Sequence, residues 1–219
     1  MSIHHRTGDR ARTELDLSRI CAFSDGVLAI SITLLVLNID VPILSKQSLH
    51  KLPDKLLELT PDLLSYALGF AVIGRFWLVH HRIFGVLSAW DGRLMALNLL
   101  FLGFAGLIPF TSDLLALYED QPAAVICYAA VIAAASLMSW AMVAHARRQN
   151  FIKGSGLESA LLYGNARALV IPGVFLVSIP VAFLSPPIAE CLWVATFFLH
   201  PSRRSVRKSN DAPPQQSTA

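Results

Sequence analysis

Long apolar stretches alternate with short charged segments along this chain of 219 residues. A helix needs roughly 20 apolar residues to cross the ~30 Å hydrocarbon core of a bilayer. Six stretches of this kind predict six transmembrane helices, at about 19–39, 63–84, 94–117, 123–146, 161–184 and 188–200. The last of them is short for a span. The pattern therefore predicts an all-α, polytopic membrane protein.

The composition supports this fold class. Hydrophobic residues make up 54% of the chain and charged residues only 15%, whereas a soluble domain carries about 25% charged residues. The first eighteen residues are polar and lack the apolar core of a signal peptide, so the first span should remain in the mature protein. The three cysteines all fall in apolar stretches, without the spacing of a disulfide or zinc site.

The distribution of lysine and arginine predicts the orientation. Thirteen basic residues lie in the N-terminal arm, between spans two and three, between spans four and five, and in the tail, whereas Lys46, Lys51 and Lys55 occupy one loop on the other side. The positive-inside rule then places both termini in the cytoplasm and agrees with an even number of spans. A net charge of +3 arranged in this way does not indicate a nucleic-acid partner.

The segments outside the spans complete the predicted organisation. Residues 1–18 form a cytoplasmic arm, 19–200 a six-helix transmembrane domain, and 201–219 a basic tail with too little apolar material to fold. The loop 42–61 is mildly amphipathic and could place a short helix on the outer surface. Three prolines, Pro109, Pro172 and Pro180, fall inside predicted spans, where we expect kinks.

Asp25 interrupts the first span about one and a half turns after its start. A carboxylate is costly inside a membrane, so Asp25 should face either a partner or cytoplasmic water. At about 100° per residue, Ile30, Leu34 and Leu37 form one stripe with Thr33 on its flank, and Asp25 lies about 140° from Ile30. The span therefore has one aliphatic face, and the acid points elsewhere.

The second span carries polar residues towards the same side of the membrane, where Arg75, His80 and His81 follow one another within GRFWLVHH. A hydrogen-bonded Asp–His or Asp–Arg pair between the two spans is geometrically possible. The adjacent histidines point about 100° apart with no further ligand beside them, which disfavours a metal site. Asn98 and Ser139 are isolated polar residues that would bond one helix to another.

An enzyme has little support in this sequence. Ser24, Asp25 and His80 could be arranged as a triad on paper, but no nucleophile elbow, metal motif or phosphate-binding loop accompanies them. We expect no enzymatic activity, no metal and no cofactor.

The first span resembles the R-x-x-x-F-S-D signature that opens the transmembrane protein 175 family of potassium channels. Arg19, Phe23, Ser24 and Asp25 match that signature, the following GVLAISITLLVL is similar to bacterial members, and the histidine pair after FWLV resembles the family's second span. The resemblance extends to six spans with cytoplasmic termini. It implies a homotetramer in which the first helix of each subunit lines a central ion pathway.

The resemblance also implies roles for individual residues. It places the narrowest constriction at Ile30, further hydrophobic layers at Leu34 and Leu37, and the residue implicated in potassium preference at Thr33. Neither the family nor this sequence contains the TVGYG filter of ordinary potassium channels. A structural network bracing the helices would comprise Arg19, Ser24, Asp25, His80 and His81. On one helix Arg19 and Asp25 lie about 120° and roughly 9 Å apart, so any pairing would run through a neighbouring helix.

These inferences predict a passive, potassium-permeable cation channel of modest selectivity in the inner cell membrane of a bacterium, with the bilayer and K⁺ as its partners. A proton-coupled transporter or proton pathway using Asp25 and His80 or His81 is the main alternative. A non-conducting membrane scaffold is the third.

Overall fold

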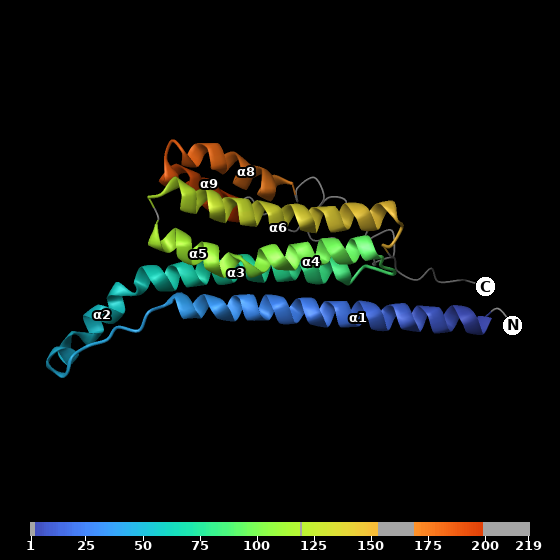
Figure 1. The fold of residues 1–219 in the computed structure, drawn as a ribbon, viewed down its shortest axis with the longest axis horizontal. Coiled ribbons are helices and arrows are strands. Elements are labelled where there is room, and N and C mark those ends of the chain that lie inside the picture. Colours follow the sequence, from blue (N-terminus) through green and yellow to red (C-terminus); the bar gives the residue numbers. More distant parts are fainter. Residues whose placement is uncertain (1–2, 119, 153–168, 199–219) are drawn as a thin grey trace, which may run out of the picture.

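The structure, a computed structural model, describes residues 3–118, 120–152 and 169–198 (Figure 1). In these ranges the chain is helical, and its one β-type pairing is an isolated bridge between Leu87 and Ile152. The helices are α1 (Ile3–Leu34), the short 3-10 helices η1 (Leu35–Asn38) and η2 (Lys46–Lys51), α2 (Leu52–Glu58), α3 (Thr60–Phe84), α4 (Gly92–Gly106), α5 (Ile108–Leu117), α6 (Pro122–Arg148), α8 (Val170–Ala182) and α9 (Pro186–Phe198).

The long helices run side by side as an elongated bundle (Figure 1). Helix α1 forms one edge and packs on α3, α4 and α5, while α6 packs on α4, α5, α8 and α9 at the opposite side. The bundle therefore leaves α1 covered on one side only. The α2 segment projects beyond the bundle at one end.

Four helical segments are long and apolar enough to cross a membrane: Leu15–Asn38, Lys46–Phe84, Gly92–Leu117 and Pro122–Arg148. They correspond to the first four predicted spans. Helices α8 and α9 have only 13 residues each, so the fifth and sixth predicted spans are represented by shorter apolar helices. The parts of those spans at 161–168 and 199–200, and the predicted tail, lie outside the described residues.

The first helix begins much earlier than the first apolar stretch. Helix α1 starts at Ile3 and continues without a break into the span. Most of the predicted cytoplasmic segment, residues 1–18, is therefore helical (Figure 1). A polar segment can continue a helix into water because its backbone hydrogen bonds are made within the segment itself. Hydropathy marks the part of a helix in the membrane, not the whole helix.

The three prolines have different consequences. The predicted third span divides at Leu107 into α4 and α5, and Pro109 lies in the first turn of α5, where it needs no donor. Asn38 Nδ2 donates a hydrogen bond of 3.2 Å to the Pro109 carbonyl, which ties the end of η1 to this break. Pro172 lies in the first turn of α8, and Pro180 lies inside α8 shortly before its end. Pro109 is thus the one that separates two described helices.

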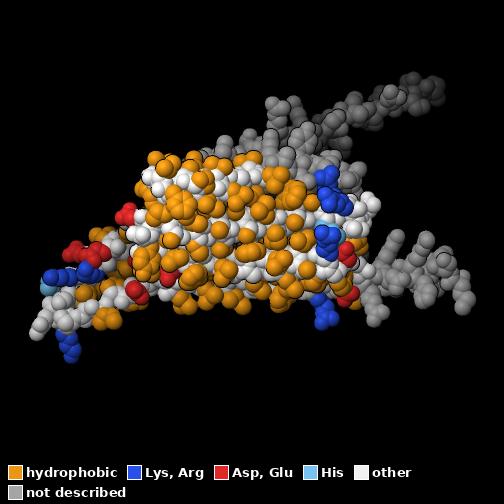
Figure 2. Space-filling view, turned by 45° about the horizontal axis from the view of Figure 1, so that its top comes forward, with side chains coloured by type: hydrophobic (Ala, Val, Ile, Leu, Met, Phe, Trp, Pro, Cys, Tyr) orange, Lys and Arg blue, Asp and Glu red, His pale blue; other side chains and the backbone are white. Residues whose placement is uncertain are grey.

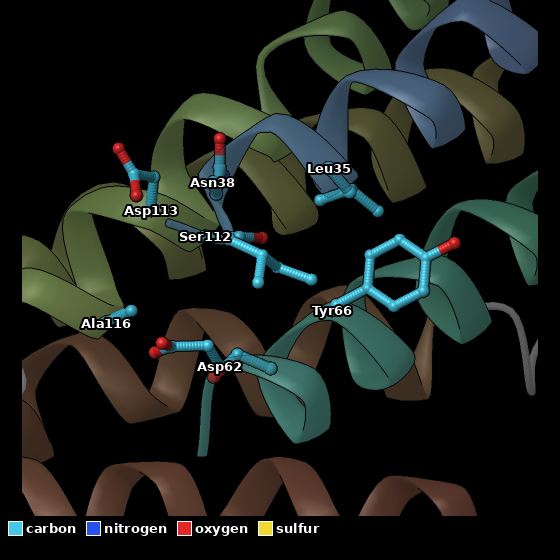
Figure 3. Close-up of a pocket in the computed structure, with 9 residues that line it drawn as sticks. Leu35, Asn38, Asp62, Tyr66, Ser112, Asp113 and Ala116 are labelled. Atoms are coloured by element: carbon cyan, nitrogen blue, oxygen red, sulfur yellow. The ribbon is translucent and has the colours of Figure 1, made fainter. Parts of the chain in front are cut away.

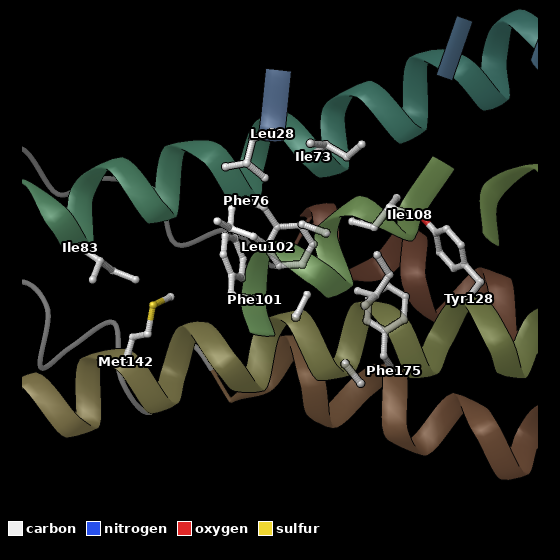
Figure 4. Packing of buried hydrophobic residues seen from close by; sticks show 14 of the residues in the cluster. Leu28, Ile73, Phe76, Ile83, Phe101, Leu102, Ile108, Tyr128, Met142 and Phe175 are labelled. Carbon is white, nitrogen blue, oxygen red and sulfur yellow. The ribbon is translucent and has the colours of Figure 1, made fainter. Parts of the chain in front are cut away.

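The core joins α1, α3, α4, α5 and α6 and continues to α8 and α9 through Phe175 and Trp193 (Figure 4). Large side chains such as Leu28, Ile73, Phe101 and Ile108 are fully buried there. Helix α6 contributes mainly small residues, including several buried alanines, which allow the neighbouring backbones to approach closely. Outside this core, the bundle presents a continuous hydrophobic belt with charged groups beyond its ends (Figure 2).

The two ends of the belt differ in charge. Arg82, Arg93, Arg147 and Arg148 lie at the ends of α3, α4 and α6 that meet at one end of the bundle, which we call the arginine end (Figures 1 and 2). The α2 segment lies at the other end, which we call the arm end. This separation matches the distribution of basic residues expected of a protein that crosses a membrane.

Hydrogen bonds at the arginine end hold the α3–α4 loop to the end of α6. His145 Nε2 donates to both carboxylate oxygens of Asp91, at 3.0 and 2.8 Å. Ser88 donates from its backbone nitrogen and from Oγ to the Phe151 carbonyl, at 2.7 and 2.8 Å. Asn150, with φ of 56°, turns the chain after α6 so that Phe151 reaches this loop.

Asp91→Ala is expected to destabilise the protein by about 1 kcal/mol, because Asp91 is the N-cap of α4 and accepts a 2.8 Å hydrogen bond from the Leu94 nitrogen. That bond, followed by the interaction with His145, lowers the pKa of Asp91. A carboxyl with a lowered folded pKa stabilises the protein above its unfolded pKa, about 4, and loses this effect as the pH falls through the lower folded value. Thermal unfolding in detergent should therefore separate wild type from variant near neutral pH and bring them together in strong acid. Asp91→Asn, which keeps a capping residue, should lose less.

Candidate functional site

The first membrane span, formed by α1 and continued by η1, has two opposite faces. Ser24, Leu28, Ser31 and Leu35 are buried against the bundle. Their spacing of three or four residues places them on one side of the helix. This face holds α1 in its position, so the residues on the other face are presented outwards by a fixed helix.

The outward face carries the predicted aliphatic stripe. The exposed fractions of Ile30, Leu34 and Leu37 are 60%, 42% and 73%. Such exposure of large apolar side chains is compatible with lipid or another protein surface, and it leaves room for an ion pathway between copies. The single chain shows which way the stripe points, and its role as a constriction stays a prediction.

Thr33 lies on the same exposed side. Its Oγ1 donates a 2.8 Å hydrogen bond to the Ile30 carbonyl one turn earlier. The hydroxyl hydrogen is thus directed at the backbone, and the oxygen lone pairs remain available for a cation. The predicted role of Thr33 in ion selectivity is compatible with this geometry and remains a prediction.

A buried chain of hydrogen bonds links α1, α4 and α3. Asn98 Nδ2 donates to Ser24 Oγ at 3.0 Å, and His80 Nε2 donates to Asn98 Oδ1 at 2.9 Å. Ser24 in turn donates to the Ile20 carbonyl. None of the three side chains is more than 1% exposed. Asn98 therefore connects two of the predicted network residues, Ser24 and His80, that do not contact each other directly.

Asp25 interacts with a different residue of α3. Trp77 Nε1 donates a 2.8 Å hydrogen bond to Asp25 Oδ1, and the Trp77 ring stacks on His81 with centroids 5.7 Å apart. Asp25 is thus hydrogen-bonded to a tryptophan, whereas the sequence indicated a histidine or an arginine of the second span. Arg19 and His81 are exposed, and within the described residues Arg19 forms no ion pair with Asp25.

Trp77 is the site residue that sequence reasoning missed. It stands three positions before His80 and four before His81, and its indole N–H needs an acceptor when the ring lies at a helix interface. This need for an acceptor was the feature of the sequence that could have indicated a role for Trp77. The role of Asn98 as a bond between helices was predicted, but not its position between Ser24 and His80.

Asp25→Ala and Trp77→Phe are expected to destabilise the protein similarly, by about 1 kcal/mol each, because each removes the same hydrogen bond between α1 and α3. Thermal unfolding in detergent measures both, and the double variant should cost little more than either single one. Flux per folded protein should remain near wild type if Asp25 braces α1. Lost flux in a stably folded Asp25→Ala would instead place this carboxylate in the ion pathway.

A small pocket of about 30 Å³ lies between η1 and the arm-end parts of α3 and α5 (Figure 3). Asn38, Asp62, Tyr66, Ser112 and Asp113 are among its lining residues. It lies beside Leu35, on the packed side of α1, and so does not coincide with the exposed stripe.

These elements coincide with the region that a known family shares. The profile of the endosomal/lysosomal potassium channel TMEM175 matches residues 19–109, which include α1 from Arg19 onward, all of α3, and Asn98. A potassium channel of Chamaesiphon minutus is 34% identical over 196 residues, covering 86% of this chain and 96% of the relative. The chain belongs to the TMEM175 family.

The fold of this TMEM175 family member agrees with a solved structure. The crystal structure of a lysosomal potassium-selective channel TMEM175 homologue from Chamaesiphon minutus superimposes with a TM-score of 0.69 at 30% identity, covering 84% of this chain and 95% of that one. The endosomal/lysosomal proton channel TMEM175 of Gallus gallus is 34% identical over 113 residues, which is only 23% of that longer protein. The expected family, and the all-α membrane fold with it, are confirmed.

Proposed function

We propose that this protein is a potassium-permeable cation channel whose pathway is lined by the exposed face of α1. The observation that carries the proposal is the exposed stripe of Ile30, Leu34 and Leu37, opposite a face of α1 that the bundle buries. A dry aliphatic constriction can gate ions by dewetting. This chain is similar, over nearly the whole length of the relative, to a protein named as a potassium channel. This similarity supports potassium as the permeant ion.

One chain cannot enclose a pathway with one face of one helix, so the proposal includes a homotetramer around a central axis. It also includes the bacterial inner membrane and cytoplasmic termini, for which the arginine end of the bundle is the support. No catalytic step and no cofactor are required, because K⁺ moves down its own gradient.

Purified protein in potassium-loaded liposomes tests the proposal. We expect potassium efflux that follows the membrane potential, does not saturate as a carrier would, and exceeds sodium flux. Protein that folds and yet carries no ion would overturn it.

A proton pathway is the second candidate, because animal relatives are named as proton channels. The same liposomes with a pH-sensitive dye separate the two. Proton flux that depends on Asp25 or His81, without potassium flux, would favour the alternative. His80 is less suited to a relay, since it is buried with its Nε2 bonded to Asn98.

Thr33→Val is expected to lower the preference for potassium over sodium about twofold, because it removes the hydroxyl oxygen beside the constriction while keeping the size of the side chain. Thr33→Ser keeps the oxygen and should retain the preference. Reversal potentials in planar bilayers with potassium on one side and sodium on the other measure both variants. Equal selectivity in Thr33→Val and wild type would remove Thr33 from the pathway.

A further inference from the structure

The segment formed by η2 and α2, residues 46–58, leaves the bundle at the arm end, and we call it the arm (Figure 1). Within the described residues, α2 contacts η2 and the start of α3. No residue of the arm is buried in this single chain.

The arm has an apolar face without a partner. In α2, the helical spacing places Leu52, Leu56 and Leu57 on one side and Asp54, Lys55 and Glu58 on the other. The exposed fractions of the three leucines are 41%, 51% and 71%. A short helix with one apolar face is stable only when that face is covered, so the arm requires an occupant outside its own chain.

The direction of the arm limits what this occupant can be. The arm projects to the side of the bundle on which α1 lies, away from α6 and α8 (Figure 1). The exposed stripe of α1 faces the same side, because α3, α4 and α5 cover the other one. The connection between them also exposes large apolar side chains, namely Leu37, Val41 and Ile43.

The charges on the arm favour protein over lipid. Three lysines are nearly balanced by Asp54 and Glu58, and Lys55 is already paired with Glu58 in the same helix. A helix that binds anionic headgroups needs a clear excess of basic residues on its polar face. A nearly neutral polar face is instead suited to contact with a protein surface of mixed charge.

We infer that the apolar face of the arm packs on a neighbouring copy of this chain, at the arm end of the ion pathway. The inference rests on the proposed function, because it takes the exposed face of α1 to be the side on which copies meet. The arms would then surround the entrance through which ions reach Leu37 and Ile30. Their charged residues would lie beside that entrance.

Cysteine cross-linking in the full-length protein tests the contact. In a background of Cys21→Ala, Cys127→Ala and Cys191→Ala, Leu57→Cys is placed on the arm. Leu184→Cys is the matched control, because Leu184 lies in the turn after α8, at the same end but the opposite edge of the bundle. Leu184 is 87% exposed against 71% for Leu57, so poor access cannot explain a weaker reaction of the control.

A short bis-maleimide, added to each protein in dilute liposomes, should give several-fold more covalent dimer with Leu57→Cys than with Leu184→Cys. Equal or absent dimer in a protein that still conducts potassium overturns the arm contact and leaves the proposed function intact. If the cysteine-free parent carries no potassium although wild type does, the native cysteines are restored one at a time until potassium flux returns. Absence of flux in wild type itself overturns the proposed function.

A fluorescent maleimide attached to the same two cysteines tests whether lipid, rather than a neighbouring copy of the chain, covers the arm. If headgroup spin-labelled lipid quenches the Leu57→Cys label as strongly as the Leu184→Cys label, the arm lies on the bilayer and the inference is wrong. Weak quenching together with the dimer supports it.

Discussion

Ile30→Asn is expected to raise potassium flux about tenfold and to admit sodium as well. Ile30 is the stripe residue nearest the middle of the span Leu15–Asn38, and 60% of it is exposed. An amide at this position would keep the proposed constriction wet. A tenfold change corresponds to lowering the barrier by about 1.4 kcal/mol, a modest demand on one polar group in a dry passage. Ion flux in liposomes, with potassium and sodium in separate experiments, measures the effect.

Val177→Asn is the matched control for this result. Val177 lies on α8, at the far side of the bundle from α1, and is 59% exposed against 60% for Ile30. The same amide on a lipid-facing surface should leave flux per folded protein unchanged. If both variants raise flux equally, the membrane has become leaky; if neither does, Ile30 does not line the pathway.

Asn98→Leu is expected to destabilise the protein by about 1–3 kcal/mol, the cost of leaving a buried polar group without its hydrogen bond. Asn98 donates to Ser24 and accepts from His80, so its loss affects α1 and α3 together. Without these bonds the exposed stripe of α1 would no longer be held in one orientation. We expect a lower unfolding temperature in detergent and a smaller fraction of assembled protein in size-exclusion chromatography.

Two controls separate this network from a general effect of losing an asparagine. Asn38→Leu removes a single 3.2 Å hydrogen bond at an exposed position and should cost well under 1 kcal/mol. His80→Phe combined with Asn98→Leu should recover part of the stability, because apolar partners leave nothing unpaired. Phenylalanine at position 80 also keeps the ring stacking on Phe84 and Phe101. A double variant no more stable than Asn98→Leu would contradict this account.

The spans show which parts of the fold could be predicted from hydropathy. The first four were found because each has enough apolar residues to cross the membrane core, and this is a property of composition alone. The start of α1 at Ile3 was missed because the residues before the span are polar. Hydropathy does not distinguish a polar helix from a polar loop. The division of the third span at Leu107 was anticipated as a kink at Pro109, because proline lacks the donor that a helix interior needs.

The candidate site divides in the same way. The stripe of Ile30, Leu34 and Leu37 follows from the helical repeat, so the sequence alone predicted that these side chains share a face. The partner of Asp25 and the position of Asn98 between Ser24 and His80 depend on which sides of α3 and α4 turn towards α1. That choice is made by the packing of large side chains such as Leu28, Ile73 and Phe101. Periodicity within one helix cannot reveal it, because each helix can rotate about its own axis until its neighbours are in place.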